Sequence, residues 1–395
     1  MYSSAPEPTK TRKWLPGLLG ISLILSIGIL WRGLAKRNEA PPGSREDHNS
    51  SAPLVDAPES TTAQVTLGRD QEKPAGEGLA RLVNELRQTA SPEASRNVLL
   101  RIRALLNSVP PDIASRIIRD FLSSGTDMPT HQGFVVGPRG QLLEAPTLRT
   151  FLLDHLESID SRGAAQLGRE ILQNPGSPDE WALALRSVAK SDASNQTRAF
   201  LEDRLHLLLS YEPWQRQPHV SYLEAFDVAV HLGGDALMPD LTRLIRMTNN
   251  PAVAHAAFLA TDRLIQSNPT RILRALLSDV EALKGRESTR AALFARADLS
   301  SLDQLQVIES YLLHPAIDES ELDAFADVFP NENNMLSQNL LTHTRTRDGA
   351  AIRARDVQSL QVIKSWLKDP RFQRITPVLT AIQSRLESFL PPKGP

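Results

Sequence analysis

Helix-starting signals recur along most of this chain, and they restrict what it can fold into more than any other feature. Ser91 and Pro92, like Ser177 and Pro178, stand together at the head of an apolar run. A serine at the N-cap accepts a hydrogen bond from a free backbone N–H, and proline suits the first helical turn. Proline also pushes the preceding residue out of helical conformation, and Asn-Pro or Asp-Pro steps occur at 174–175, 250–251, 268–269 and 369–370. The pattern predicts many short helices.

Two stretches of the chain repeat each other at an offset of 55 residues. "LQVIESYLLHP" at 305–315 and "LQVIKSWLKDP" at 360–370 match at seven of eleven positions, and their apolar residues fall on one helical face. With the helix lengths and the proline punctuation, this echo resembles the HEAT and armadillo class of helical repeats. The resemblance implies stacked helix pairs that bury a continuous core and present a curved binding surface rather than a chemistry. The offset exceeds the roughly 40 to 47 residues usual in that class, so the repeat register stays open.

Residues 132 to 146, "QGFVVGPRGQLLEAP", interrupt the helical pattern. β-Branched and aromatic residues flank a Gly-Pro-x-Gly turn, which predicts a short β-hairpin. A two-stranded hairpin alone is only marginally stable in water, so this one is expected to lean on neighbouring helices.

The hairpin has two interpretations. It is either a compact connector between helices, or a protruding finger with Arg139 at its tip that contacts a partner. The candidate partner contacts are Phe134, Val136, Arg139 and Leu142. Burial of Phe134, Val135 and Leu142 together would favour the connector.

An uncharged segment of 18 residues runs from Trp14 to Trp31, with basic residues at both ends. As a helix it would span roughly 27 Å, close to the hydrocarbon thickness of a bilayer. The predicted membrane-interface anchors are Trp14, Trp31, Lys13 and Arg32, because indole and basic side chains prefer the interface. A cleavable signal peptide is the alternative, but no small-x-small site follows the apolar core. The segment therefore predicts a transmembrane anchor over 14–31 that contacts membrane lipid.

The predicted localisation is a single-pass membrane protein. Residues 1–13 form a short tail that is expected on the cytoplasmic side, and the large domain is expected to be exported. Residues 32–75 are rich in Pro, Ser and Thr, which predicts a disordered, flexible linker. The helical repeat-like domain is placed at 76–390 and a C-terminal tail at 391–395. A small-xxx-small serine pair within the anchor could support helix pairing, so a homo-oligomer is one option.

The chain lacks the usual signatures of catalysis and of cofactor or metal binding. It contains no cysteine, and its histidines, such as His155, occur singly without ligand spacing. Ser187 and Lys190 fit a Ser-x-x-Lys pattern similar to that of penicillin-recognising enzymes, but the companion motifs are missing. The acidic stretch 318–329 is predicted as a solvated helix face with its apolar residues inward; a site for a basic partner or a cation is the alternative. No catalytic residue, cofactor or metal ligand is therefore assigned.

The expected fold class is all-α: an α-solenoid-like stack of helix pairs with one short β-hairpin insertion, preceded by a single transmembrane helix and a disordered linker. The net charge of −2 shows no basic excess, so nucleic-acid binding is not expected. The expected function is a membrane-tethered helical scaffold or protein-interaction module with an unknown protein partner, in envelope assembly or signalling. The alternative is an envelope enzyme whose site is assembled from sequence-distant residues, in a deep pocket of titratable groups.

Overall fold

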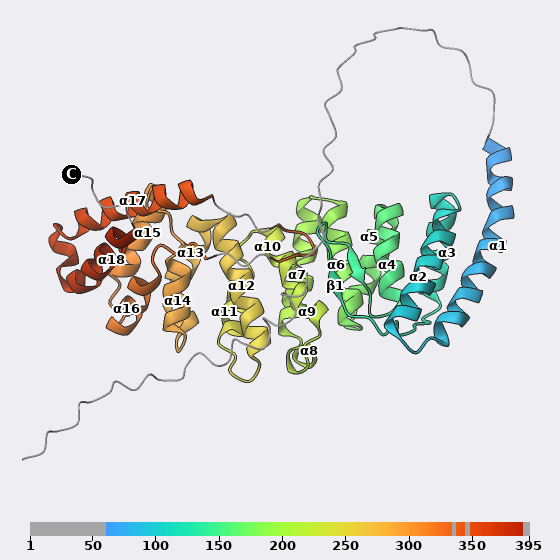
Figure 1. The fold of residues 1–395 in the computed structure, drawn as a ribbon, viewed down its shortest axis with the longest axis horizontal. Helices are drawn as coiled ribbons and strands as arrows, with labels where there is room; N and C mark the ends of the chain where they lie inside the picture. Colours follow the sequence, from blue (N-terminus) through green and yellow to red (C-terminus); the bar gives the residue numbers. More distant parts are fainter. Residues whose placement is uncertain (1–60, 334–336, 344–347, 390–395) are drawn as a thin grey trace, which may run out of the picture. The chain divides into compact units, whose positions relative to one another are not determined.

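The structure is a computed structural model that describes residues 61–333, 337–343 and 348–389. The chain divides into two units, Met1–Glu59 and Ser60–Pro395, and every described residue belongs to the second. Within that unit the described chain is mostly helical, and the helices pack on helices close to them in sequence (Figure 1). These findings confirm the prediction of a mostly helical domain, and the packed helix pairs are compatible with a helical-repeat architecture.

The helices of the first half are α1 (Thr61–Arg87), α2 (Pro92–Asn107), α3 (Pro111–Ser123), α4 (Leu148–Ile159), α5 (Ser161–Ile171), α6 (Pro178–Ser191), α7 (Asn195–Ser210), α8 (Glu212–Arg216) and α9 (Val220–Glu224). Those of the second half are α10 (Phe226–Leu232), α11 (Met238–Ile245), α12 (Pro251–Ser267), α13 (Pro269–Ser278), α14 (Glu287–Phe294), α15 (Leu302–Leu312), α16 (Glu319–Val328), α17 (Gly349–Trp366) and α18 (Thr376–Phe389), with short 3-10 helices η1 (Val280–Leu283) and η2 (Pro370–Ile375). Among the described residues, one sheet is found, formed by β1 (Val135–Val136) and β2 (Leu142–Glu144).

The helix starts predicted from serine and proline are confirmed. The side chains of Ser91, Ser177 and Asn250 each accept a hydrogen bond from the backbone N–H three residues on, at 3.2, 3.5 and 3.3 Å. Each of these residues precedes a proline in the first turn of its helix. These helix boundaries are therefore set locally, by side-chain capping and by proline.

The two matching sequence stretches fall on α15 and α17. Ile308 and Ile363 are both buried, and so are Tyr311 and Trp366, which follow them by three residues. The indole N–H of Trp366 also donates to Glu309 at 2.9 Å, so the two helices are in contact. The repeated sequence is therefore a repeated core face, which the stacking of helix pairs requires.

The structure contradicts the predicted transmembrane helix and the single-pass membrane localisation. In the part of the chain that it describes, every helix is too short or too polar to traverse a lipid bilayer. The physical reason is polarity or length: α3 carries charged residues on one face, and α6, which is buried on most sides, has only 14 residues. The segment for which the anchor is predicted, 14–31 with Trp14, Trp31, Lys13 and Arg32, lies outside the described residues.

Helix α1 begins at Thr61, inside the predicted linker 32–75. Ala75 is buried where α1 packs on α2 and α3. Glu72 forms an ion pair with Arg116 of α3 at 3.1 Å. Contact with two neighbouring helices can stabilise a helix whose composition is too polar to indicate one.

The predicted β-hairpin is confirmed. β1 pairs antiparallel with β2, with Val135 opposite Glu144 and Val136 opposite Leu142. Phe134, Val136 and Leu142 are buried, whereas Val135 is 40% exposed. The condition that would favour a simple connector, burial of Phe134, Val135 and Leu142 together, is therefore not met. One side of the hairpin enters the core and the other side meets solvent.

The predicted solvated face of the stretch 318–329 is wrong at one residue. Glu321 is buried and pairs with Arg290 of α14, whose Nε donates to it at 2.8 Å. The hydroxyl of Tyr311 donates to the same carboxylate at 2.8 Å, and burial, followed by the charge of Glu321, raises the pKa of Tyr311. The apolar residues of the stretch, Leu322, Phe325 and Phe329, are buried as predicted. The pattern of one helix could not show Glu321 as buried, because its partners come from two other helices.

Residues 337–343 depart from the nearest-neighbour packing of a helical repeat. They follow α16 in sequence but lie beside α10, where Figure 1 shows them in orange-red. Asp227 of α10 accepts hydrogen bonds from the backbone N–H groups of Leu341 (2.6 Å) and Thr342 (2.9 Å). The segment therefore joins parts of the described chain that are 114 residues apart in sequence.

Glu224, at the end of α9, is half-buried and close to this contact. Burial, followed by repulsion from Asp227, raises the pKa of Glu224 to about 7, although the charge of Arg263 acts in the opposite direction. A glutamate in an unfolded chain has a pKa of about 4.3. Between these two values the folded chain holds a proton at Glu224 that the unfolded chain has released. The contribution of Glu224 to stability is therefore present at low pH and is lost as the pH rises through about 7.

The substitution Glu224→Gln is expected to remove this pH dependence, because the amide cannot ionise. At pH 8 the variant should have a free energy of unfolding about 1–2 kcal/mol above that of the unchanged protein, after allowance for partial exposure. At pH 5 the difference should stay below about 0.5 kcal/mol. Urea unfolding at both pH values measures it, with Glu77→Gln, at an exposed position of α1, as the control. An equal effect at both pH values would contradict the prediction.

Candidate functional site

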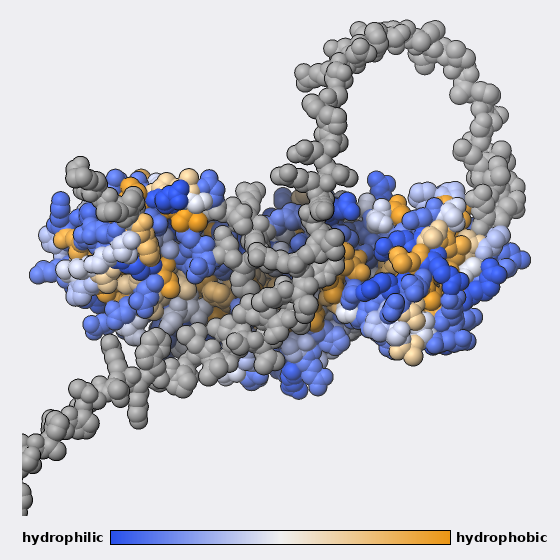
Figure 2. All heavy atoms as spheres, in the orientation of Figure 1, coloured by the Kyte–Doolittle hydropathy of each residue, from blue (hydrophilic) through white to orange (hydrophobic). Residues whose placement is uncertain are grey.

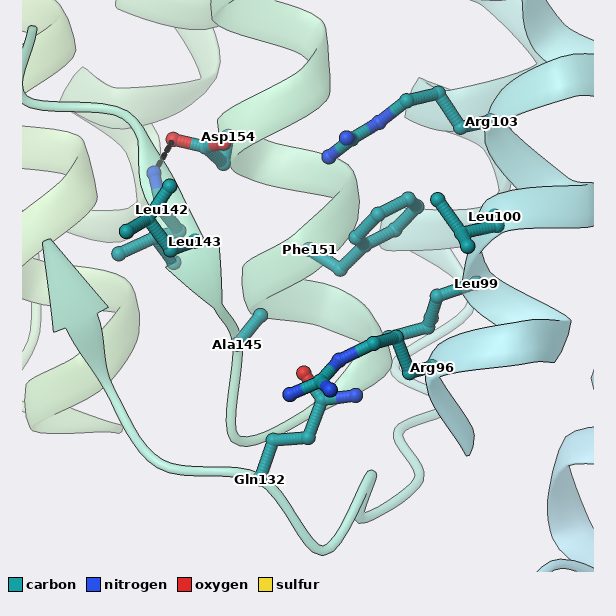
Figure 3. A pocket seen from close by; sticks show the side chains of 10 residues that line it. All are labelled: Arg96, Leu99, Leu100, Arg103, Gln132, Leu142, Leu143, Ala145, Phe151 and Asp154. Carbon is teal, nitrogen blue, oxygen red and sulfur yellow. Dashed lines mark hydrogen bonds between the residues drawn. The ribbon is translucent and has the colours of Figure 1, made fainter. Parts of the chain in front are cut away.

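A pocket opens between α2, the hairpin and α4 (Figure 3). The space that its lining atoms leave free is about 370 Å³, and this volume includes space open to solvent. Its lining comes from α2 (Arg96, Leu99, Leu100 and Arg103), from the hairpin and its flanks (Gln132, Leu142, Leu143 and Ala145) and from α4 (Phe151 and Asp154). Two arginines thus share a small pocket with mostly apolar neighbours, and we refer to it as the α2–hairpin pocket.

The α2 residues Arg96, Leu100 and Arg103 line the pocket from a side of the helix that adjoins its buried side. Arg96, Leu100 and Arg103 are spaced four and three residues apart, so they lie along one side of the helix. Leu99 and Ile102 occupy the neighbouring side and are buried in the core. The packing of Leu99 and Ile102 in the core holds the helix in place. The side with Arg96, Leu100 and Arg103 is therefore fixed in position and still accessible.

Large apolar side chains are exposed around the pocket. Leu100 is 54% exposed and Leu143 is 60% exposed, and both line it. Strand alternation explains Leu143, since its neighbour Leu142 points into the core and successive side chains point to opposite faces. Figure 2 shows hydrophobic surface, in orange, over the region of α2 to α4 and over the hairpin.

The two arginines of the pocket differ in how their charges are balanced. Arg96 forms an ion pair with Glu144 at 2.5 Å. The guanidinium of Arg103 lies 5.1 Å from the ring centre of Phe151 and reaches across the pocket in Figure 3. Stacking on an aromatic face stabilises a cation but leaves its N–H donors free. No ion pair of Arg103 with a carboxylate is found among the described residues.

A buried arginine, Arg186, ties the hairpin to two helices through the pocket residue Asp154. Asp154 accepts a hydrogen bond from the backbone N–H of Leu142 at 3.0 Å, drawn as the dashed line in Figure 3. It also pairs with Arg186 of α6 at 2.8 Å. Burial raises the pKa of Asp154, against the opposing charge of Arg186. The Nη1 of Arg186 donates to the carbonyl of Gly140 at 2.5 Å as well, so the hairpin is held at both its second strand and its turn.

His155 follows Asp154 in sequence but has a different environment. It is buried, and its ring stacks on Phe151 with 6.3 Å between ring centres. Burial, followed by the charge of Arg103, lowers the pKa of His155. The imidazole is therefore neutral near pH 7, and it packs as an aromatic ring rather than acting as a cation.

Ser187 and Lys190 are brought together by a carboxylate that does not activate the serine. The Ser187 hydroxyl donates to Glu157 Oε2 at 2.7 Å, and Lys190 Nζ donates to Glu157 Oε1 at 2.8 Å. Burial acts to raise the pKa of Glu157, but Arg186 and Lys190 outweigh it and hold that pKa below its usual value. A carboxylate with a lowered pKa is a poor general base. The Ser-x-x-Lys pattern is thus part of an ion-pair cluster.

The predicted partner contacts fall into two groups. Leu142 lines the α2–hairpin pocket, whereas Phe134 and Val136 are buried. Arg139 is exposed at the turn, as expected for the tip of the hairpin. The hairpin therefore contributes to the candidate site mainly through its second strand, not through its tip.

Sequence reasoning missed the helical half of the site. Arg96, Leu100 and Arg103 stand within "RNVLLRIR", where the core face of α2 is the most visible signal. The spacing of four and three residues does place them on one face. A leucine between two arginines at this spacing was the one local signal that could have found them.

Neither the side-chain clusters of the described residues nor the comparisons with known proteins indicate a metal site or a known family. Within the described residues, no three His, Asp or Glu side chains come together in a way that could hold a metal ion. Comparison of the chain with protein-family models, with curated proteins and with solved structures finds no match. The geometry of the described residues therefore carries the functional argument alone.

Proposed function

We propose that the helical domain is a protein-interaction module of the HEAT or armadillo kind, which binds a partner protein at the α2–hairpin pocket. The observation that supports this is a pair of exposed apolar side chains in the lining of one pocket: Leu100 is 54% exposed and Leu143 is 60% exposed. Apolar side chains that remain in water beside a pocket are typical of interaction sites. A scaffold role in assembly or signalling is the broader form of the proposal, and membrane attachment is no part of it.

The pocket fits a partner segment that carries a large apolar side chain next to a carboxylate. Leu100 and Leu143 offer apolar surface that can be removed from water, at about 25 cal/mol per Å². Arg103 offers a guanidinium that is already oriented by Phe151. A guanidinium pairs with a carboxylate through two parallel hydrogen bonds, which adds geometric selectivity. Arginine and aromatic side chains also dominate the energy of many interfaces.

The same pocket favours binding over the alternative of an enzyme. Its one carboxylate, Asp154, is engaged by Arg186 and by the backbone of Leu142. General acid–base catalysis needs a titratable group within reach of the substrate. Phe151 and the leucines of the pocket have no such group, and the two arginines offer only N–H donors.

We expect peptides selected on the full chain from a displayed random library to combine a large apolar residue with Asp or Glu. Their binding should weaken at least tenfold when the chain carries Arg103→Glu or Leu100→Asp, because the first change repels the carboxylate and the second removes the apolar contact. Fluorescence anisotropy with the selected peptides measures this loss. Both side chains are exposed or partly exposed, so the free energy of unfolding should change by less than about 1 kcal/mol.

The matched control is Leu302→Asp on α15, at a leucine that is 68% exposed and lies outside the pocket. Peptides should bind this variant as tightly as they bind the unchanged chain. Selected peptides without an acidic residue, or equal loss of binding in the Leu302→Asp and Arg103→Glu variants, would contradict the proposal.

A further inference from the structure

Residues 337–343 are held in the way that a bound peptide is held. One carboxylate, that of Asp227, accepts the backbone N–H groups of Leu341 at 2.6 Å and of Thr342 at 2.9 Å. The hydroxyl of Thr342 donates to the other oxygen of the same carboxylate. Asp227 is itself buried and paired with Arg263 of α12 at 2.5 Å. Main-chain hydrogen bonds of this kind give affinity for a chain segment without requiring most of its side chains.

Three side chains of the segment add selectivity. Leu340 is fully buried and belongs to the core. Arg263 donates to the side-chain oxygen of Asn339 at 3.3 Å, and the Asn339 amide donates to the carbonyl of Thr342 at 3.1 Å. Asn339 thereby holds the bend of the segment, while Leu340 fills an apolar space and Thr342 completes the hydrogen bonds to the carboxylate. A segment of the type Asn-Leu-x-Thr fits this chemistry.

The tip of the hairpin forms the opposite side of the contact. Gly140 has a φ of +77°, and a Cβ atom at this position would lie 2.1 Å from the carbonyl oxygen of Leu340. Glycine alone therefore allows the two backbones to approach this closely. Arg186 fixes the other side of the turn through its hydrogen bond to the Gly140 carbonyl.

We propose that Asp227, Arg263 and Gly140 form a peptide-docking surface, which residues 337–343 occupy within the chain. A partner protein with an Asn-Leu-x-Thr segment would displace them and bind in their place. The hydrogen bonds to Asp227 and Arg263 come from residues 339–342, so a short free segment can make all of them.

The contact is also unusual for a stack of helices, which supports the proposal. Helical repeats are stabilised by contacts between neighbours, whereas this contact joins residues that are 114 positions apart in sequence. Of the residues that line the α2–hairpin pocket, none is among Asp227, Arg263 and Gly140. The proposal therefore does not rest on the function proposed above, and either can fail alone.

The contact at the hairpin tip gives the first test. In a Gly140→Ala variant, the amides of Leu341 and Thr342 should exchange hydrogen at least tenfold faster, because the added methyl group overlaps the backbone of the segment. Gly285→Ala is the matched control: Gly285 has a φ of +79°, and no atom lies within 4 Å of its Cβ position. It carries the same backbone strain without the overlap. Equal exchange of the two amides in both variants would contradict the contact.

The docking proposal itself is tested with a labelled heptapeptide, Ser-Gln-Asn-Leu-Leu-Thr-His, which has the sequence of residues 337–343. The full chain with Leu340→Ser releases its own segment and should bind this peptide saturably, with a dissociation constant in the micromolar to millimolar range. Adding Asp227→Asn should weaken binding at least tenfold, because the carboxylate that accepts the backbone N–H groups is lost. Adding Leu302→Asp instead should leave it unchanged, since Leu302 is exposed on α15 and belongs to neither surface.

Two results would overturn the proposal. One is the absence of saturable binding to a Leu340→Ser chain that keeps the helical circular-dichroism spectrum of the unchanged protein. The other is equal binding of a control peptide in which the first leucine is replaced by serine. If the Leu340→Ser chain loses its helical spectrum, the proposal is tested on the unchanged protein by hydrogen exchange. Excess peptide should then accelerate hydrogen exchange at Leu341 and Thr342, and no acceleration at millimolar peptide rules the docking surface out.

Discussion

One buried guanidinium holds together the elements on which both candidate surfaces depend. Arg186 is fully buried, and Asp154 at 2.8 Å and Glu157 at 2.7 Å balance its charge. A buried charge that loses its partner is strongly destabilising, so α4 and α6 must keep their relative positions. The same side chain binds the carbonyl of Gly140 and extends this constraint to the hairpin.

A fixed hairpin has different consequences on its two sides. A two-stranded hairpin would not keep its shape in water alone, but Asp154 holds the N–H of Leu142 and Arg186 holds the turn. With Leu142 anchored, strand alternation directs Leu143 toward solvent, where it is 60% exposed and lines part of the α2–hairpin pocket. With the turn anchored, Gly140 presents bare backbone to residues 337–343. One ion-pair cluster thus explains an exposed leucine and a close backbone contact.

The sequence predicted the features that depend on a few consecutive residues. Ser91 and Ser177 mark helix starts because a cap and a proline act within one turn. Failures occurred where a distant partner decides the outcome. Glu321 was expected on a solvated face, yet Arg290 and Tyr311 from other helices make its burial favourable. The residues of α2 that line the pocket were missed for a related reason. Arg96, Leu100 and Arg103 do recur at helical spacing, but the buried leucines and isoleucine of the same helix form a stronger pattern.

The docking surface at Asp227 could not be predicted from short stretches of sequence, because the residues that form it have other ordinary roles. Gly140 fits a turn equally well whether or not another chain segment approaches it, so its residue type carries no sign of the contact with Leu340. Asp227 likewise resembles any acid in the first turn of a helix, where a negative charge is already favoured. Recognition by backbone hydrogen bonds leaves little pattern in a sequence, because every residue except proline has the same N–H. Surfaces of this kind become visible when a segment is seen in place on them, and here the chain supplies that segment itself.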